Sequence, residues 1–184
     1  MMTRRERERS IARPVGWVPG FRFLAGFGLL LAGYYWVILL PWGDRALYAY
    51  LRVNAWLSNS ILQLVGEHTT VTDVTIRATG FALAVRRGCD ALEPAWFFCA
   101  AILAFPAPWR RKTVALLVGA SGILALNLVR IVSLFLIGRR FPAFFVTAHL
   151  ELWPAGFILL AVSLWLLWIR SIRVPAGTDS DVVS

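Results

Sequence analysis

The chain has 184 residues, of which 59% are hydrophobic and 16% are charged. Soluble domains are usually about 45–50% apolar, so this composition excludes an ordinary soluble globule. The formal net charge of +9 comes from basic residues that cluster at the ends of hydrophobic segments. That pattern is the topology signal of membrane proteins rather than a nucleic-acid-binding surface. We therefore predict one membrane domain in a lipid bilayer, without a nucleic-acid partner.

The beginning of the chain is rich in arginine, so residues 1–20 are predicted to form a basic cytoplasmic segment. The membrane domain would follow over residues 21–170 and begin with an apolar run at 21–40. This run is long enough to cross a membrane as a helix, and the PWGD sequence after it offers no signal-peptide cleavage site. We therefore expect an uncleaved first membrane helix.

Residues 41–90 are expected to lie outside the membrane. Polar residues interrupt the apolar residues of 46–65 at a spacing that can place much of the polarity on one helical face. This pattern predicts an amphipathic helix that lies along the membrane surface or leans into the bundle. The next stretch, VTDVTIRATGFALAV, is rich in β-branched residues and has Gly80 at its middle. This composition predicts a short extracytoplasmic β-hairpin that leads the chain to Cys89.

Three further hydrophobic segments complete the membrane domain, at residues 91–105, 113–137 and 144–169. The PAPWRRK connection between the first two is short and basic, so it should be cytoplasmic. This orientation requires four crossings and leaves 46–65 outside the membrane, whereas a fifth crossing at 46–65 would place the basic connection outside. Residues 171–184 have little to bury and are expected to form a flexible cytoplasmic tail. The predicted fold class is an all-α polytopic membrane protein with about four transmembrane helices, the surface helix and the hairpin.

Arg130 lies inside the hydrophobic segment 113–137, about eight residues from its outer end, or about 12 Å along a helix. An arginine at the centre of a membrane helix costs about 2.5–3.5 kcal/mol on insertion scales, and such residues usually face the bundle interior or a wet cavity. Arg130 could instead extend to the outer headgroups, or bond to Asn127, Ser133 or a backbone carbonyl. The sequence leaves both the functional and the structural interpretation open.

The two cysteines have different settings. Cys99 lies within WFFCAAIL, which is typical of a small buried hydrophobe. Cys89 lies beside Asp90 at the start of a predicted helix, where free N–H groups and the helix dipole favour a thiolate, so we expect a lowered pKa for this thiol. Ten residues of helix separate the two sulfurs by about 15 Å, which excludes an intrachain disulfide.

His149 is one of two histidines and the one that lies within a hydrophobic segment. In the four-crossing topology, Cys89, Arg130 and His149 come from three segments but share one level near the outer face. A thiolate can attack a peptide carbonyl, an imidazole can move protons, and a guanidinium can stabilise an oxyanion, so these residues are candidates for acyl transfer. His149 alone is also compatible with a structural role. Metal-ligand spacings and phosphate-binding glycine loops are absent from the sequence, so no cofactor is expected.

The segments GCDALEP and NLVRI, followed by a histidine that opens the last hydrophobic helix, resemble the exosortase/archaeosortase family, most closely its short bacterial exosortases. The resemblance covers roughly residues 47–169. It implies a cysteine transpeptidase of the bacterial inner membrane, with its active site near the extracytoplasmic face. Its partners would be exported proteins with a C-terminal sorting signal made of a short motif, a hydrophobic helix and a basic cluster. The resemblance also implies that Cys89 is the nucleophile, Arg130 the transition-state or substrate-binding arginine, and His149 the general acid/base.

One departure concerns the nucleophile, because many members have Cys-Ser-Gly where this chain has Cys89-Asp90-Ala91. Asp90 would raise the pKa of the thiol unless it caps the helix or pairs with an arginine. Two other functions stay open. One is a non-enzymatic transporter or binding subunit that holds an anionic ligand with Arg130, and the other is a lipid- or polymer-modifying enzyme that uses His149 and Arg130 on a phosphate.

Overall fold

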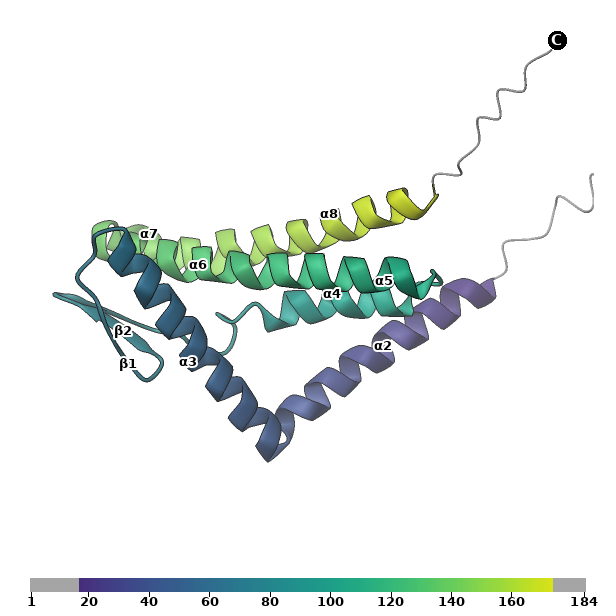
Figure 1. Ribbon diagram of the computed structural model, residues 1–184, viewed down its shortest axis with the longest axis horizontal. Coiled ribbons are helices and arrows are strands. Elements are labelled where there is room, and N and C mark those ends of the chain that lie inside the picture. Colours follow the sequence, from purple (N-terminus) through teal and green to yellow (C-terminus); the bar gives the residue numbers. More distant parts are fainter. Residues whose placement is uncertain (1–16, 174–184) are drawn as a thin grey trace, which may run out of the picture.

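The computed structural model describes residues 17–173 and is mainly helical, with one small sheet at one end (Figure 1). The predicted basic segment and tail lie outside the described residues, except for residues 17–20 and 171–173. The helical elements are α2 (Trp17–Leu39), α3 (Pro41–Leu64), α4 (Leu92–Ala104), α5 (Trp109–Ala115), η1 (Leu116–Ala120), α6 (Ser121–Arg140), α7 (Pro142–Thr147), η2 (Ala148–Leu152) and α8 (Trp153–Arg173). The strands are β1 (Thr70–Thr72), β2 (Thr75–Ala78) and β3 (Phe81–Ala84).

Three helices are long and apolar enough to cross a membrane: Gly20–Leu39, Trp109–Arg140 and Pro142–Ser171. The second joins α5, η1 and α6 without a break, and the third joins α7, η2 and most of α8. The segment expected to cross at 91–105 is α4, which has 13 residues. At 1.5 Å per residue α4 is about 20 Å long, against about 30 Å for a hydrocarbon core. Multi-pass membrane character is therefore supported, while the count of four crossings stays a prediction.

The chain turns sharply between α2 and α3, which form a V in Figure 1. Leu40 is extended, and Pro41 begins α3, where its missing N–H costs no helical hydrogen bond. Gly43 is required in this bend, because a Cβ there would lie 2.0 Å from the carbonyl oxygen of Val37. The bend directs α3 away from α2 and across the end of α6 that carries the sheet.

Helix α3 contains the expected amphipathic segment 46–65, and its inward face combines apolar residues such as Leu51 and Leu62 with small polar ones. Asn54 and Ser58 are buried, whereas Val53 and Trp56 are exposed. The amide of Asn127 on α6 donates a hydrogen bond to Asn54 Oδ1 at 3.2 Å. The exposed Val53 and Trp56 make the outer face of α3 suited to contact lipid.

The predicted two-stranded hairpin is wrong in one respect, because the segment forms a three-stranded antiparallel sheet in the order β1-β2-β3. Gly80, with φ +80°, makes the second turn, as its position suggested. The first turn lies between Thr72 and Thr75 and places Asp73 at φ +60°. Aspartate tolerates this conformation better than most residues but signals a turn less clearly than glycine does.

Two hydrophobic clusters hold these elements together. The first joins α3, the sheet and α6, and its most buried members include Leu62, Ile76 and Phe135. The second joins α4, α6 and α8 through Phe98 and Phe157, among others. The loop between β3 and α4 runs from one cluster to the other, since Val85 belongs to the first and Ala91 to the second. The core thus fixes both ends of the loop that contains Cys89.

Candidate active site

Cys89 lies in the short loop between β3 and α4 and is half-buried. Gly88 before it has φ +84°, a conformation that glycine adopts without strain, and Ala91 after it has φ +54°. The amide of Cys89 donates to the carbonyl of Arg86 at 2.9 Å, and the amide of Val85 donates to Val74 at 2.8 Å. These bonds and the buried ends of the loop give Cys89 a defined position.

His149 lies next to Cys89, although it is sixty residues further along the chain. The sulfur of Cys89 lies 3.6 Å from Nδ1 and 3.7 Å from Nε2 of His149, so either tautomer presents a nitrogen to the thiol. His149 belongs to η2, a π-helical turn, and such turns often occur at functional sites. The ring of Phe145, one turn earlier, stacks on the imidazole at 5.7 Å between centroids and an interplanar angle of 9°. The imidazole is therefore held beside the thiol by its own helix.

Arg130 is buried on α6, with 4% of its surface exposed, which argues against extension of its side chain to the headgroups. Its Cζ atom lies 5.6 Å from the ring centroid of Phe157 on α8, a cation–π arrangement. Its Nε atom has no hydrogen-bond partner among residues 17–173. The Ser133 hydroxyl bonds to the backbone carbonyl of Arg130, not to its side chain. A buried guanidinium with an unused donor is suited to bind an anion or a developing negative charge.

Burial raises the pKa of the Cys89 thiol above its ordinary value. The positive charge of Arg130 and a backbone hydrogen bond at Arg86 lower this pKa, and the negative charge of Asp90 raises it. The expected lowering of the pKa is therefore wrong. The expected lowering rested on free N–H groups at the start of α4. Burial outweighs that effect, and Asp90 Oδ1 already accepts the Leu92 N–H at 3.0 Å. Burial therefore favours the neutral thiol over the thiolate at Cys89.

Asp90 itself is 5% exposed and occupies a structural position beside the nucleophile candidate. Its side chain satisfies the first turn of α4, and the Tyr50 hydroxyl donates to its backbone carbonyl at 2.9 Å. The neighbouring Arg87 pairs with Asp44 rather than with Asp90. Asp90 therefore has partners that hold its carboxylate toward the helix.

The other cysteine, the other histidine and the glutamates Glu93 and Glu151 do not take part in this contact. Cys99 is half-buried on α4 and packs against the second hydrophobic cluster, in keeping with a packing role. His68 and Glu151 are exposed, and Glu93 accepts a long hydrogen bond of 3.5 Å from Tyr35. Within residues 17–173, no group of three His, Cys, Asp or Glu side chains could hold a metal ion.

Two contributors to the site were not identified from the sequence. Phe145 could have been found, because it lies four residues before His149 and therefore on the same helical face. Phe157 beneath Arg130 had no such signal, since its contact joins two different helices.

Comparison with known proteins gives one match. Residues 11–169 match the family described as Transmembrane exosortase (Exosortase_EpsH). No curated protein and no solved structure matches the chain. The family match covers most of the 184 residues and includes the loop, α6 and η2. The chain therefore belongs to the transmembrane exosortase family and is a multi-pass membrane protein of that family.

Proposed function

We propose that this protein is a membrane cysteine transpeptidase that cleaves C-terminal sorting signals of exported proteins at the outer face of the bacterial inner membrane. The observation that carries the proposal is the 3.6 Å contact between the Cys89 sulfur and His149, beside the buried Arg130. Nucleophile, base and charge come from three separate elements, and a nucleophile within reach of a base is the signature of covalent catalysis.

In the first half-reaction, His149 takes the proton of the Cys89 thiol, whose raised pKa makes a base necessary at neutral pH. The sulfur attacks the carbonyl carbon of the scissile peptide bond, and the carbonyl oxygen becomes an oxyanion next to Arg130. When the tetrahedral intermediate collapses, the C–N bond breaks and the imidazolium gives its proton to the leaving amine. The products are a thioester on Cys89 and the released C-terminal peptide.

In the second half-reaction, an amine or water attacks the thioester carbon while His149 removes its proton. The C–S bond breaks, the acceptor becomes acylated, and the sulfur regains its proton from the imidazolium. Each side chain thus returns to its starting protonation state, and the cycle requires no cofactor.

The test is cleavage of a tagged exported protein carrying a candidate sorting signal, with Cys89→Ala compared to Cys99→Ala. Cys99 is the matched control, since it is also half-buried and lies ten residues away. We expect Cys89→Ala to abolish processing and Cys99→Ala to retain it, with a hydroxylamine-sensitive acyl-enzyme in the latter. Processing by Cys89→Ala at the wild-type rate would sink the proposal.

Orientation is tested in the Cys99→Ala background, where Cys89 is the single thiol. An impermeant thiol reagent should label Cys89 from the extracytoplasmic side. Labelling from the cytoplasmic side alone would contradict the proposed topology.

A second candidate function rests on the unpartnered Nε of Arg130, which would suit a binding subunit for an anionic ligand. That function makes a different prediction, because Cys89→Ser would leave binding intact while Arg130→Ala would abolish it. A comparison of these two variants separates the binding subunit from the enzyme.

A further inference from the structure

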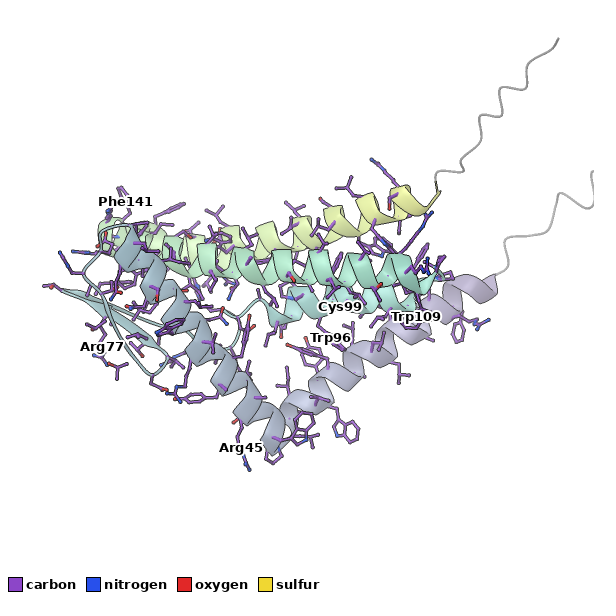
Figure 2. All side chains as sticks on the ribbon, in the orientation of Figure 1. Arg45, Arg77, Trp96, Cys99, Trp109 and Phe141 are labelled. Carbon is purple, nitrogen blue, oxygen red and sulfur yellow. The ribbon has the colours of Figure 1, made fainter. Side chains whose placement is uncertain are left out.

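A cavity of about 460 Å³ opens between α4, the α5–η1 segment and α8, far from Cys89. It lies at the end of the bundle marked by Trp109, whereas Arg77 marks the sheet at the other end (Figure 2). Its walls are almost entirely apolar and include Phe98, Val118 and Trp168. Arg110 and Arg111 line the same cavity. The cavity is thus an apolar slot with two guanidinium groups on its wall.

Local structure explains why the slot is there. The π-helical segment η1 forms one wall, and Gly119 within it is contacted so closely by Phe98 that an added Cβ would lie 2.3 Å from the ring. At the arginine end, the indole of Trp168 donates to the carbonyl of Arg111 at 3.2 Å, and Arg111 Nη1 donates to the carbonyl of Ser171 at 3.3 Å. The slot is therefore built from packed residues and does not require a loop to form it.

The charge at this end has no acidic counterpart nearby in the chain. No aspartate or glutamate occurs between Glu93 and Glu151. None of the ion pairs among residues 17–173 involves Arg110 or Arg111. Lys112 differs from both, because its ammonium is buried and donates to the carbonyl of Leu103 at 2.7 Å. Both guanidinium groups therefore line the slot without an ion-pair partner among residues 17–173.

We propose that this cavity binds an anionic phospholipid, with an acyl chain in the slot and the headgroup phosphate at Arg110 and Arg111. Apolar walls match the hydrocarbon chain, and planar guanidinium groups match phosphate oxygens. Basic pockets between membrane helices are known to bind anionic headgroups. A lipid in this position fills the space between α4 and α8, the two helices that follow Cys89 and His149 in the chain. The inference does not depend on the proposed transpeptidase activity.

The experiment titrates the full chain in neutral detergent with phosphatidylglycerol or phosphatidylcholine of the same acyl composition, and counts bound lipids by native mass spectrometry. We expect tighter binding of phosphatidylglycerol by the wild type. Each arginine near an anionic headgroup contributes a factor of about five, so Arg110→Gln/Arg111→Gln should weaken phosphatidylglycerol binding about 25-fold. Phosphatidylcholine binding should not change with this variant, and inorganic phosphate alone should not compete.

Two matched controls separate a specific site from general attraction. Arg45→Gln/Arg77→Gln removes two exposed arginines away from the cavity and should leave binding unchanged. Val118→Trp should fill the slot, whereas Leu117→Trp next to it changes a residue of similar exposure, 71% against 70%, outside the lining. Equal losses in both arginine variants would overturn the proposal, because binding would then follow net charge. Unchanged binding in Val118→Trp would overturn the placement of the acyl chain.

Discussion

Replacing Arg130 by glutamine should slow acyl transfer by two separable effects. Arg130 is 4% exposed and its Nε has no hydrogen-bond partner within residues 17–173, so its guanidinium is available to the oxyanion. Loss of one oxyanion donor typically lowers kcat by about 10²–10³, or roughly 3–4 kcal/mol. The same charge also lowers the pKa of Cys89. Arg130→Gln should therefore raise that pKa, and each pKa unit reduces the thiolate fraction about tenfold at neutral pH.

A pH profile distinguishes the two effects. Thiolate is lost as pH falls below the pKa of the thiol, so a raised pKa lowers the rate at pH 7 and has no effect once the pH exceeds it. The midpoint of thiol ionisation is measured from the pH dependence of Cys89 alkylation by iodoacetamide in the Cys99→Ala background. The plateau of the cleavage rate is measured by single-turnover cleavage at high pH. We expect Arg130→Gln to shift the midpoint upward and to lower the plateau. Arg130→Lys should keep the midpoint of thiol ionisation nearer that of the wild type, because the positive charge remains. It should lower the plateau of the cleavage rate, because a lysine lacks the planar guanidinium with its several donors.

A rate and a midpoint that both stay at wild-type values in Arg130→Gln would refute this reasoning. A shifted midpoint with an unchanged plateau would assign Arg130 to the thiol alone. The thermal midpoint of each variant in detergent serves as the folding control.

Two further predictions concern the packing that holds the site. Asn127→Ala leaves the buried Oδ1 of Asn54 without its donor and should destabilise the protein by about 1–2 kcal/mol. Replacing both Asn54 and Asn127 by leucine should recover most of this loss. An equal loss of stability in the double variant would contradict the pairing. Gly138→Ala should cost about 1–3 kcal/mol, because its Cβ would lie 2.2 Å from Phe81 Cζ. Gly122→Ala on the same helix meets no atom within 4 Å and should be neutral or stabilising, so equal stability of the two alanine variants in detergent unfolding would argue against the contact.

Length and hydropathy were sufficient to predict the three long apolar helices, because long apolar runs have few alternatives in water or lipid. The run at 21–40 became the span Gly20–Leu39, as expected. Two features depended on finer chemistry. The turn at Asp73 lacks a glycine, and the π-helical segments η1 and η2 arise from helix packing that hydropathy does not describe. Tertiary contacts, rather than local pattern, decided these details.

The candidate site was predicted because its three residues were expected at the same level in the membrane, and a common level alone does not establish contact between side chains. It brought Cys89 and His149 to the same end of the bundle, but a contact of 3.6 Å across sixty residues depends on the packing of α4 against α8. The pKa of the thiol was misjudged because the expectation considered the helix start and the neighbouring charges but not burial, which is the largest influence on the thiol and raises its pKa.

The shortness of α4 explains why the reactive loop is so well bonded. At about 20 Å, α4 is roughly 10 Å shorter than a full crossing, and the loop before it lies beside the longer helices of the bundle. Irregular backbone inside a membrane is tolerated only where protein covers it and satisfies its polar groups. Here the Val85 amide donates to the carbonyl of Val74 in the first turn of the sheet, and the Tyr50 hydroxyl on α3 donates to the carbonyl of Asp90. The sheet and α3 therefore cover the loop that carries Cys89 and satisfy its polar backbone groups.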